Sequence, residues 1–241
     1  MSSKSVLVIG GGTGIGKGIA KSFAHDDWNV AIAGRRESVL ASAAADIANS
    51  QSIHTHTVDV GNRQETTALL EWAIEKLGRV DVLVNSAGIN IKNRTMADMT
   101  PEQYDQIMTI NGIGPYNCMH AVLPHMRANG DGLIVNITSV AGKRATDLAG
   151  IAYCASKFAA TGLGTAVGLE EGANGVRVTN VYPGEVETPL LDQRPNPVSA
   201  EHRARILQPE DIGDVILAIA KMPPRAHVPE IVIKPTLQAY S

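Results

Sequence analysis

The 241-residue sequence predicts an α/β fold, a single doubly wound domain with a seven-stranded parallel sheet and helices on both faces. Three observations carry this prediction. Strand-like and helix-like segments alternate along the chain, and several strand candidates are continuous apolar runs, as in parallel strands covered on both faces. No linker, low-complexity tract or change of composition divides the chain, so residues 1–241 are interpreted as one domain.

The elements follow from short apolar runs that alternate with longer helix-like stretches. The first strand is a β-branched run that stops at a glycine cluster, and Thr100-Pro101 supplies a helix start between two later strands. Strands are expected at Ser5–Ile9, Asn29–Gly34, Ile53–Asp59, Val80–Asn85, Gly132–Ser139, Val176–Tyr182 and Glu230–Lys234. Helices are expected near 16–26, 37–50, 62–77, 101–129, 151–173 and 209–221.

Composition and charge favour a cytoplasmic protein. A net charge of −3 gives no electrostatic reason to expect nucleic acid or an anionic membrane surface as a partner. No apolar stretch approaches the length of a membrane span, and the first residues run straight into a strand, which leaves no room for a signal peptide. Cys118 and Cys154 form no disulfide framework.

The run Gly10-Gly11-Gly12-Thr13-Gly14-Ile15-Gly16 follows the first strand. Its spacing, Gly10-x-x-x-Gly14-x-Gly16, suits a strand, a tight turn and a helix start, although it differs from Gly-x-Gly-x-x-Gly. Glycine lets a phosphate come close, and the helix N-terminus offers free N–H groups to a pyrophosphate. The alternative is a glycine-rich turn that binds nothing.

Tyr153 and Lys157 lie four residues apart in the expected helix 151–173, so they project from one face about one turn apart. A phenol with a pKa of about 10 is a poor acid near neutral pH, and a nearby ammonium favours the phenolate. Such a pair can donate or take a proton at a reacting oxygen. Alone, the pattern also arises by chance on solvated helices.

Together, the glycine spacing and the Tyr/Lys pair resemble the short-chain dehydrogenase/reductase family. Asn85-Ser86-Ala87-Gly88 resembles the family's Asn-Asn-Ala-Gly, with Ser86 in place of the second Asn. Asn111 matches the family's helix Asn, Ser139 its catalytic Ser, and Pro183-Gly184-x-Val186-x-Thr188-Pro189 the loop that closes over the nicotinamide. The resemblance runs from Lys4 to at least Pro189. A looser likeness of the C-terminal part is to the branch that oxidises serine and 3-hydroxy acids.

This resemblance implies a Rossmann fold, an NAD(P)(H) cofactor and a catalytic set of Asn111, Ser139, Tyr153 and Lys157. Tyr153 would exchange the proton, Ser139 would stabilise the oxygen, and Lys157 would lower the Tyr153 pKa and bind the nicotinamide ribose. Asn111 would hold a water through its backbone. The implied cofactor-binding residues are Gly10, Gly12, Thr13, Gly14, Ile15, Arg35, Arg36, Asp59, Val60, Asn85, Ala87, Gly88, Tyr153, Lys157, Pro183, Gly184, Val186 and Thr188.

The end of the second strand predicts NADP(H) as the preferred cofactor. An NAD-type site places an acidic residue near this point for the ribose 2′-OH, and no Asp or Glu appears before Glu37. Arg35 instead offers a guanidinium suited to a 2′-phosphate. NAD(H) stays open as the alternative, as do arginines that are merely solvated, above all Arg36. Asp59-Val60 resembles the pair that flanks the adenine.

The segment Thr188–Gln208 is expected to be a substrate loop at the carboxyl edge of the sheet, where ligands bind in open α/β folds. Its residues 190–207 carry a positive excess, so one arginine could bind a substrate carboxylate; solvated charges on a mobile lid are the alternative. Glu185 could contact the substrate or face solvent, and the sequence leaves both alternatives open. His54 and His56 share one strand face without a third ligand, so no metal site is predicted. The basic residues of the loop are Arg194, His202, Arg203 and Arg205, against Asp192 and Glu201.

We therefore expect an NADP-dependent oxidoreductase that interconverts a small-molecule carbonyl and a secondary alcohol. The alternatives are an NAD-dependent dehydrogenase of the same family and a catalytically idle dinucleotide sensor or scaffold. Family members commonly assemble through the helices that correspond to 101–129 and 151–173, which implies a homotetramer or homodimer. The fold does not fix the substrate.

Overall fold

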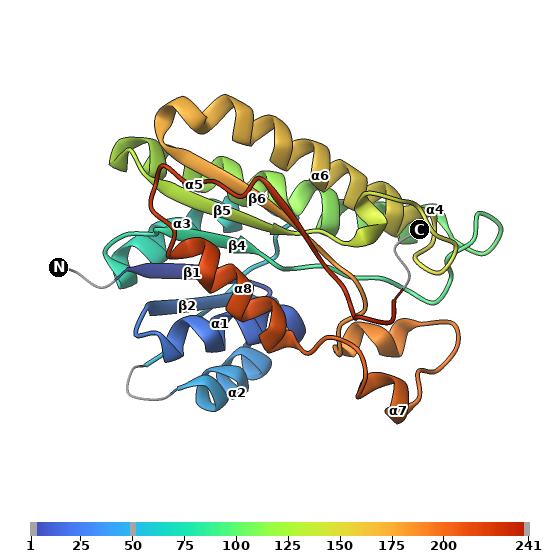
Figure 1. Ribbon diagram of the computed structural model, residues 1–241. Helices are drawn as coiled ribbons and strands as arrows, with labels where there is room; N and C mark the ends of the chain where they lie inside the picture. The colour runs from blue at the N-terminus through green and yellow to red at the C-terminus, as the bar shows by residue number, and fades with distance from the viewer. Residues whose placement is uncertain (1–3, 49–51, 239–241) are drawn as a thin grey trace.

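Seven parallel strands form one sheet in the computed structural model, in which residues 4–48 and 52–238 are described (Figure 1). Their spatial order is β3-β2-β1-β4-β5-β6-β7. The order reverses between β1 and β4, and ligands bind at such a reversal in doubly wound sheets. The predicted fold class is confirmed. The strands are β1 (Ser5–Ile9), β2 (Asn29–Gly34), β3 (His54–Thr57), β4 (Val82–Asn85), β5 (Gly132–Ile137), β6 (Val176–Pro183) and β7 (Glu230–Ile233).

Helices cover both faces of the sheet (Figure 1). On one face α1 (Gly14–His25), α2 (Glu37–Ile47) and α8 (Pro209–Ala220) pack over alternate strand residues such as Val6 and Val8. On the other, α3 (Arg63–Leu77), α5 (Gly114–Asn129) and α6 (Ile151–Glu171) pack over the intervening residues such as Leu7 and Ile9. Burial on both faces explains why the central strands read as unbroken apolar runs.

The predicted helix 101–129 is interrupted at the position of Asn111. The structure has α4 (Pro101–Met108), a π-helical turn at Thr109–Ile113, and then α5. Pro115 has no N–H, so the usual helical donor to the Asn111 carbonyl is missing, and the Gly114 N–H bonds to the Thr109 carbonyl instead. The helix pattern alone did not indicate this shift, which lies at a predicted site residue.

Other boundaries also differ from the prediction, by one or more residues. β3 is shorter than Ile53–Asp59, and β5 ends at Ile137 because Ser139 instead caps a 3₁₀ turn at Val140–Gly142, where its Oγ accepts from the Ala141 N–H. The predicted helix 37–50 is observed as α2, and its positions 49 and 50 lie outside the described residues. A further 3₁₀ turn, Gly172–Asn174, ends the α6 region.

The predicted substrate loop is more ordered than its sequence indicates. It contains a 3₁₀ helix at Pro189–Gln193 and the short α7 at Ala200–Arg203, where the Ser199 side chain accepts from the His202 N–H. The base of the loop is closed because Val186 and Leu207 pair in an isolated parallel bridge. This segment projects beyond the carboxyl ends of the strands (Figure 1), as the sequence predicts.

Candidate active site

One cavity of about 450 Å³ lies along the carboxyl edge of the sheet. Its walls come from the turn after β1, the end of β2, the loops after β3 and β4, α6 and the segment after β6. Segments far apart in the sequence therefore share one site. The predicted residues that line it are Gly10, Gly12, Thr13, Gly14, Ile15, Arg35, Arg36, Val60, Ala87, Gly88, Tyr153, Lys157 and Thr188.

Five predicted cofactor residues are not among the residues of 4–48 and 52–238 that line this cavity. Their contact with a cofactor stays a prediction, and the structure shows what each contacts within the chain. The Asp59 carboxylate accepts from the Gly61 N–H, the Asn85 amide donates to Asn136 on the next strand, and Val186 pairs with Leu207. Pro183 ends β6, and the Gly184 N–H donates to the Ile233 carbonyl.

Several lining residues were not predicted as site residues. Some directly follow predicted motifs, so extending each motif by two residues would have found Ile89, Asn90 and Leu190. Ser86 and Pro189 belong to motifs quoted above but were not chosen as site residues, and most of the others are apolar or small residues without a pattern that marks a ligand. The lining residues that the sequence analysis missed are Ile9, Gly34, Val39, Leu40, Val58, Ser86, Ile89, Asn90, Ile110, Ile137, Thr138, Pro189, Leu190 and Gln193.

The turn between β1 and α1 is built for a close approach. Gly10 has φ +81°, and a Cβ there would lie 2.6 Å from the Ala87 backbone nitrogen. The N-cap residue of α1, Thr13, makes no side-chain capping hydrogen bond. Its side chain therefore leaves the first N–H groups of α1 available to another acceptor. The turn can therefore receive a pyrophosphate at a helix N-terminus.

Arg35 and Arg36 line the cavity directly after β2, and both are exposed. Among the described residues, neither guanidinium has a carboxylate within ion-pair distance. Two uncompensated positive charges at a cavity wall favour a phosphate group there.

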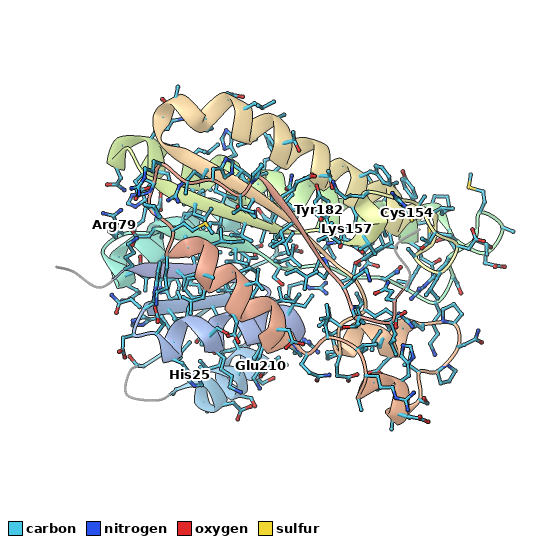
Figure 2. All side chains as sticks on the ribbon, viewed as in Figure 1. His25, Arg79, Cys154, Lys157, Tyr182 and Glu210 are labelled. Carbon is cyan, nitrogen blue, oxygen red and sulfur yellow. The ribbon has the colours of Figure 1, made fainter. Side chains whose placement is uncertain are left out.

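Tyr153 and Lys157 meet the turn after β5 at the other part of the cavity. The Tyr153 hydroxyl has a hydrogen bond with Ser139, and the Lys157 Nζ lies 5.6 Å from the centroid of the Tyr153 ring. That Nζ donates to the Ile137 carbonyl at 2.9 Å. Lys157 is buried and lies on the half of α6 that approaches the carboxyl edge of the sheet (Figure 2). The structure thus brings together Ser139, Tyr153 and Lys157.

Burial shifts both titrating groups away from their ordinary values. It raises the pKa of Tyr153 to about 12, against the opposing effects of the Ser139 hydrogen bond and the positive charge of Arg94. It lowers the pKa of Lys157 to about 8. Each shift favours the neutral form, as expected for ionisable groups removed from water. The predicted effect of Lys157 on the Tyr153 pKa stays a prediction.

Asn111 is tied to the same helix through its side chain. Its Nδ2 donates to the Ile89 carbonyl at 2.9 Å and to the Ser156 Oγ at 3.2 Å, while its Oδ1 accepts from the Ile89 N–H. The Ser156 hydroxyl in turn donates to the Tyr153 carbonyl. These bonds use only the side chain of Asn111, and the role of its backbone in holding a water stays a prediction.

The arginines predicted to bind a substrate carboxylate form ion pairs with acidic residues of the substrate loop and of the segment just before it. Arg203 pairs with Glu187 at 2.8 Å and also with Asp192, and Arg205 pairs with Glu201 at 2.6 Å. Glu185 is neither free nor solvated: it holds the third arginine, Arg194, at 3.3 Å and His202 at 2.5 Å. These charges therefore stabilise the loop itself.

The histidines and cysteines singled out in the sequence have structural surroundings that the structure now shows. His56 packs against Trp72, with ring centroids 4.7 Å apart, and the described residues contain no group of three or more His, Cys, Asp or Glu side chains that could hold a metal ion. Cys118 and Cys154 are both buried free thiols. Over the described ranges, no helix has the length and apolar character that crossing a membrane requires.

Comparison with known proteins identifies the family. The family model for short chain dehydrogenases matches residues 4–198, and the chain belongs to this family. An uncharacterized oxidoreductase of Staphylococcus saprophyticus is 33% identical over 98% of both chains. A metagenomic short-chain oxidoreductase in complex with NADP is 30% identical, with a TM-score of 0.83 over 98% of this chain and 99% of that one.

A further solved structure is similar, a 3-ketoacyl-(acyl-carrier-protein) reductase of Brucella melitensis complexed with NADH. It is 27% identical, with a TM-score of 0.83 over 96% of both chains. The predicted family is confirmed, and the chain is an oxidoreductase of that family.

Proposed function

We propose that the chain is an NADP-dependent oxidoreductase that interconverts a small-molecule carbonyl and a secondary alcohol, with Tyr153 as general acid/base. One observation carries this proposal: a single cavity is lined by the glycine turn, by Arg35 and Arg36, and by Tyr153 and Lys157. A dinucleotide-binding turn and a proton-transfer pair therefore face one space.

The residues present fit a nicotinamide dinucleotide. The uncapped start of α1 and Gly10 would hold the pyrophosphate, and the two uncompensated guanidiniums after β2 would hold a 2′-phosphate. Lys157 would bind the nicotinamide ribose. Complexes of similar proteins with NADP and with NADH support a nicotinamide cofactor, and the arginines favour NADP(H) over NAD(H).

When bound, this cofactor supplies or accepts the hydride at the carbon of the carbonyl or alcohol. In the reducing direction, Tyr153 gives its hydroxyl proton to the carbonyl oxygen as negative charge develops there. Ser139 donates a hydrogen bond to the same oxygen and stabilises that charge. A proton then returns to Tyr153 from the side of Lys157, whose Nζ lies 5.6 Å from the centroid of the Tyr153 ring.

The same fold leaves two alternatives. An NAD-dependent dehydrogenase is favoured by the similar reductase complexed with NADH, and would bind NADH at least as tightly as NADPH. An idle sensor would bind the cofactor without turnover. The presence of Ser139, Tyr153 and Lys157 in mutual reach argues against that second alternative.

A substrate screen tests the proposal. The protein is incubated with NADPH and a panel of aldehydes, ketones and keto acids, and with NADP+ and a panel of alcohols, hydroxy acids and sugar alcohols, while absorbance at the NADPH band is followed. We expect turnover on at least one member, faster with NADP(H) than with NAD(H). Tight cofactor binding with no turnover on any member would refute the enzymatic proposal.

We further propose a homotetramer or homodimer that acts in the cytoplasm and binds neither nucleic acid nor membrane. Exposed aromatic and aliphatic side chains lie on α4, the π-helical turn, α5 and α6, and a second copy of the chain would cover them. These side chains include Tyr104, Ile113, Tyr116 and Phe158. Light scattering of the purified protein gives the mass; a monomer at micromolar concentration would refute the assembly.

A further inference from the structure

The loop after β4 contains a buried arginine that the catalytic set does not include. Arg94 is only 7% exposed. Its Nε donates to the Ile91 carbonyl at 2.7 Å, its Nη2 donates to the Gln193 carbonyl at 2.8 Å, and its Nη1 donates to the Leu148 carbonyl. One guanidinium thus joins three segments of the chain whose sequence positions lie about fifty residues apart.

These three segments enclose the end of the cavity that contains Tyr153. Asn90 and Gln193 line the cavity, whereas Arg94 lies behind that wall and is not among its described lining residues. The Gln193 carbonyl ends the 3₁₀ helix of the substrate loop. The guanidinium therefore ties this loop to the loop after β4 and to the segment before α6.

The backbone of Arg94 also sets the start of α6. Its carbonyl accepts from the Ile151 N–H at 3.2 Å, two residues before Tyr153. Gly150, the N-cap residue of α6, has φ +83°, and a Cβ there would lie 2.6 Å from the Arg94 Cβ. The same junction is bonded a second time, because the Asn90 amide donates to the Ala149 carbonyl at 3.0 Å.

The charge of Arg94 has no ionic partner among the described residues, and the three hydrogen bonds of its guanidinium all go to neutral carbonyls. Burial and the nearby Arg194 both lower the pKa of Arg94, while the Tyr153 phenolate acts to raise it. In return, Arg94 acts to lower the pKa of Tyr153. The other groups that face Tyr153 are the Ser139 hydroxyl, the Cys154 thiol and the Lys157 ammonium.

We propose that Arg94 is a positioning residue that clamps the substrate loop to the start of α6, the helix that carries Tyr153. The catalytic use of Tyr153 rests on the proposed function; the clamp does not. A guanidinium suits this task, because its planar fork reaches several carbonyls at once.

A titration of Tyr153 without substrate tests whether Arg94 acts on the group that α6 carries. Tyr153 is replaced in the full chain by 3,5-difluorotyrosine, whose phenol is more acidic than that of tyrosine, and its titration is followed by ¹⁹F NMR. Arg94→Gln should raise the midpoint by roughly one pH unit, while Arg94→Lys, which keeps a positive charge, should leave it nearly unchanged. Arg205→Gln is the matched control, because Arg205 pairs with Glu201 on the exposed part of the same loop.

Amide hydrogen exchange of the same variants tests the clamp. Both Arg94 variants should exchange faster than wild type at 148–151 and 190–194, since an ammonium cannot replace three bonds of the fork, and Arg205→Gln should not. An unchanged midpoint in Arg94→Gln, or unchanged exchange in both variants, would overturn the positioning role of Arg94.

If neither variant folds, amide hydrogen exchange in the wild-type chain tests the clamp. A clamp requires segments 148–151 and 190–194 to open with the same free energy. Independent opening of the two segments would overturn it. Failure of the substrate screen, by contrast, would refute the proposed function without moving either readout.

Discussion

Charge reversal at Arg35 is the sharpest perturbation of the cofactor site. Arg35→Asp replaces one of two exposed guanidiniums at the cavity wall with a carboxylate. The variant loses a contact to the 2′-phosphate of NADPH and repels that phosphate. It also gains an acceptor for the ribose 2′-OH of NADH. NADPH binding should weaken and NADH binding should improve or stay the same.

The magnitude follows from the kind of contact. A charge-assisted hydrogen bond contributes about 1.5–3 kcal/mol, which corresponds to a loss of roughly ten- to a hundredfold in NADPH affinity. Arg36 is also at the wall, so the site keeps part of its positive charge. Because both side chains are exposed, the loss should shrink as salt is raised toward about 1 M, where screening acts over about 3 Å.

Isothermal titration or quenching of protein fluorescence gives both dissociation constants for wild type and variant. Arg225→Asp is the matched control, since Arg225 is exposed on the segment after α8 and is absent from the described cavity wall. An NADPH-to-NADH ratio that is the same in wild type and Arg35→Asp would refute the assignment of the 2′-phosphate to Arg35.

Two further predictions concern stability. Since burial lowers the folded-state pKa of Lys157 from 10.5 to about 8, the folded chain releases this proton before the unfolded chain does. Wild type should therefore gain up to about 3 kcal/mol of unfolding free energy relative to Lys157→Met between about pH 8 and 10.5. A pH-independent difference in urea titrations would contradict this. Ile216→Ala, in the fully buried contact of α8 with the sheet, should lower the free energy of unfolding by about 2–5 kcal/mol. Met96→Ala, at an exposed position, should change it by no more than about 0.5 kcal/mol. Equal midpoints of urea unfolding for the two variants would contradict this prediction.

The sequence predicted the sheet well because its central strands are buried on both faces. Short apolar runs such as Val6–Ile9 and 132–137, bounded by turn residues, are typical of buried strands, and both are strands in the structure. The edge strand β3 was overextended, since His54 and His56 alternate with exposed threonines and the pattern does not say where pairing ends. Boundaries set by side-chain caps, as at Ser139, depend on hydrogen bonds that no periodicity reveals.

Site residues could be predicted where they belong to a motif of fixed spacing. They could not be predicted where only tertiary contacts bring them to the site. Tyr153, Lys157 and the glycine turn line one cavity, as their spacing indicated. Arg94 has no motif around it; only its burial and its bonds to Leu148 and Gln193 distinguish it from a surface arginine. The pairing of Arg194 with Glu185 was equally hidden, because the excess of positive charge in 190–207 is balanced partly by acidic residues outside that range.

The measurement that tests the central claim most directly is the turnover of Tyr153→Phe beside its NADPH affinity. The substitution removes only the hydroxyl that bonds Ser139 and keeps the ring near Lys157. With a substrate found in the screen, kcat should fall at least about 10²-fold, while the NADPH dissociation constant stays within about threefold because the phenol is one of many cavity contacts. Tyr104→Phe, on the exposed face of α4, should match wild type in both. Turnover of Tyr153→Phe close to wild type would contradict the account, as would a loss of activity fully explained by lost NADPH binding.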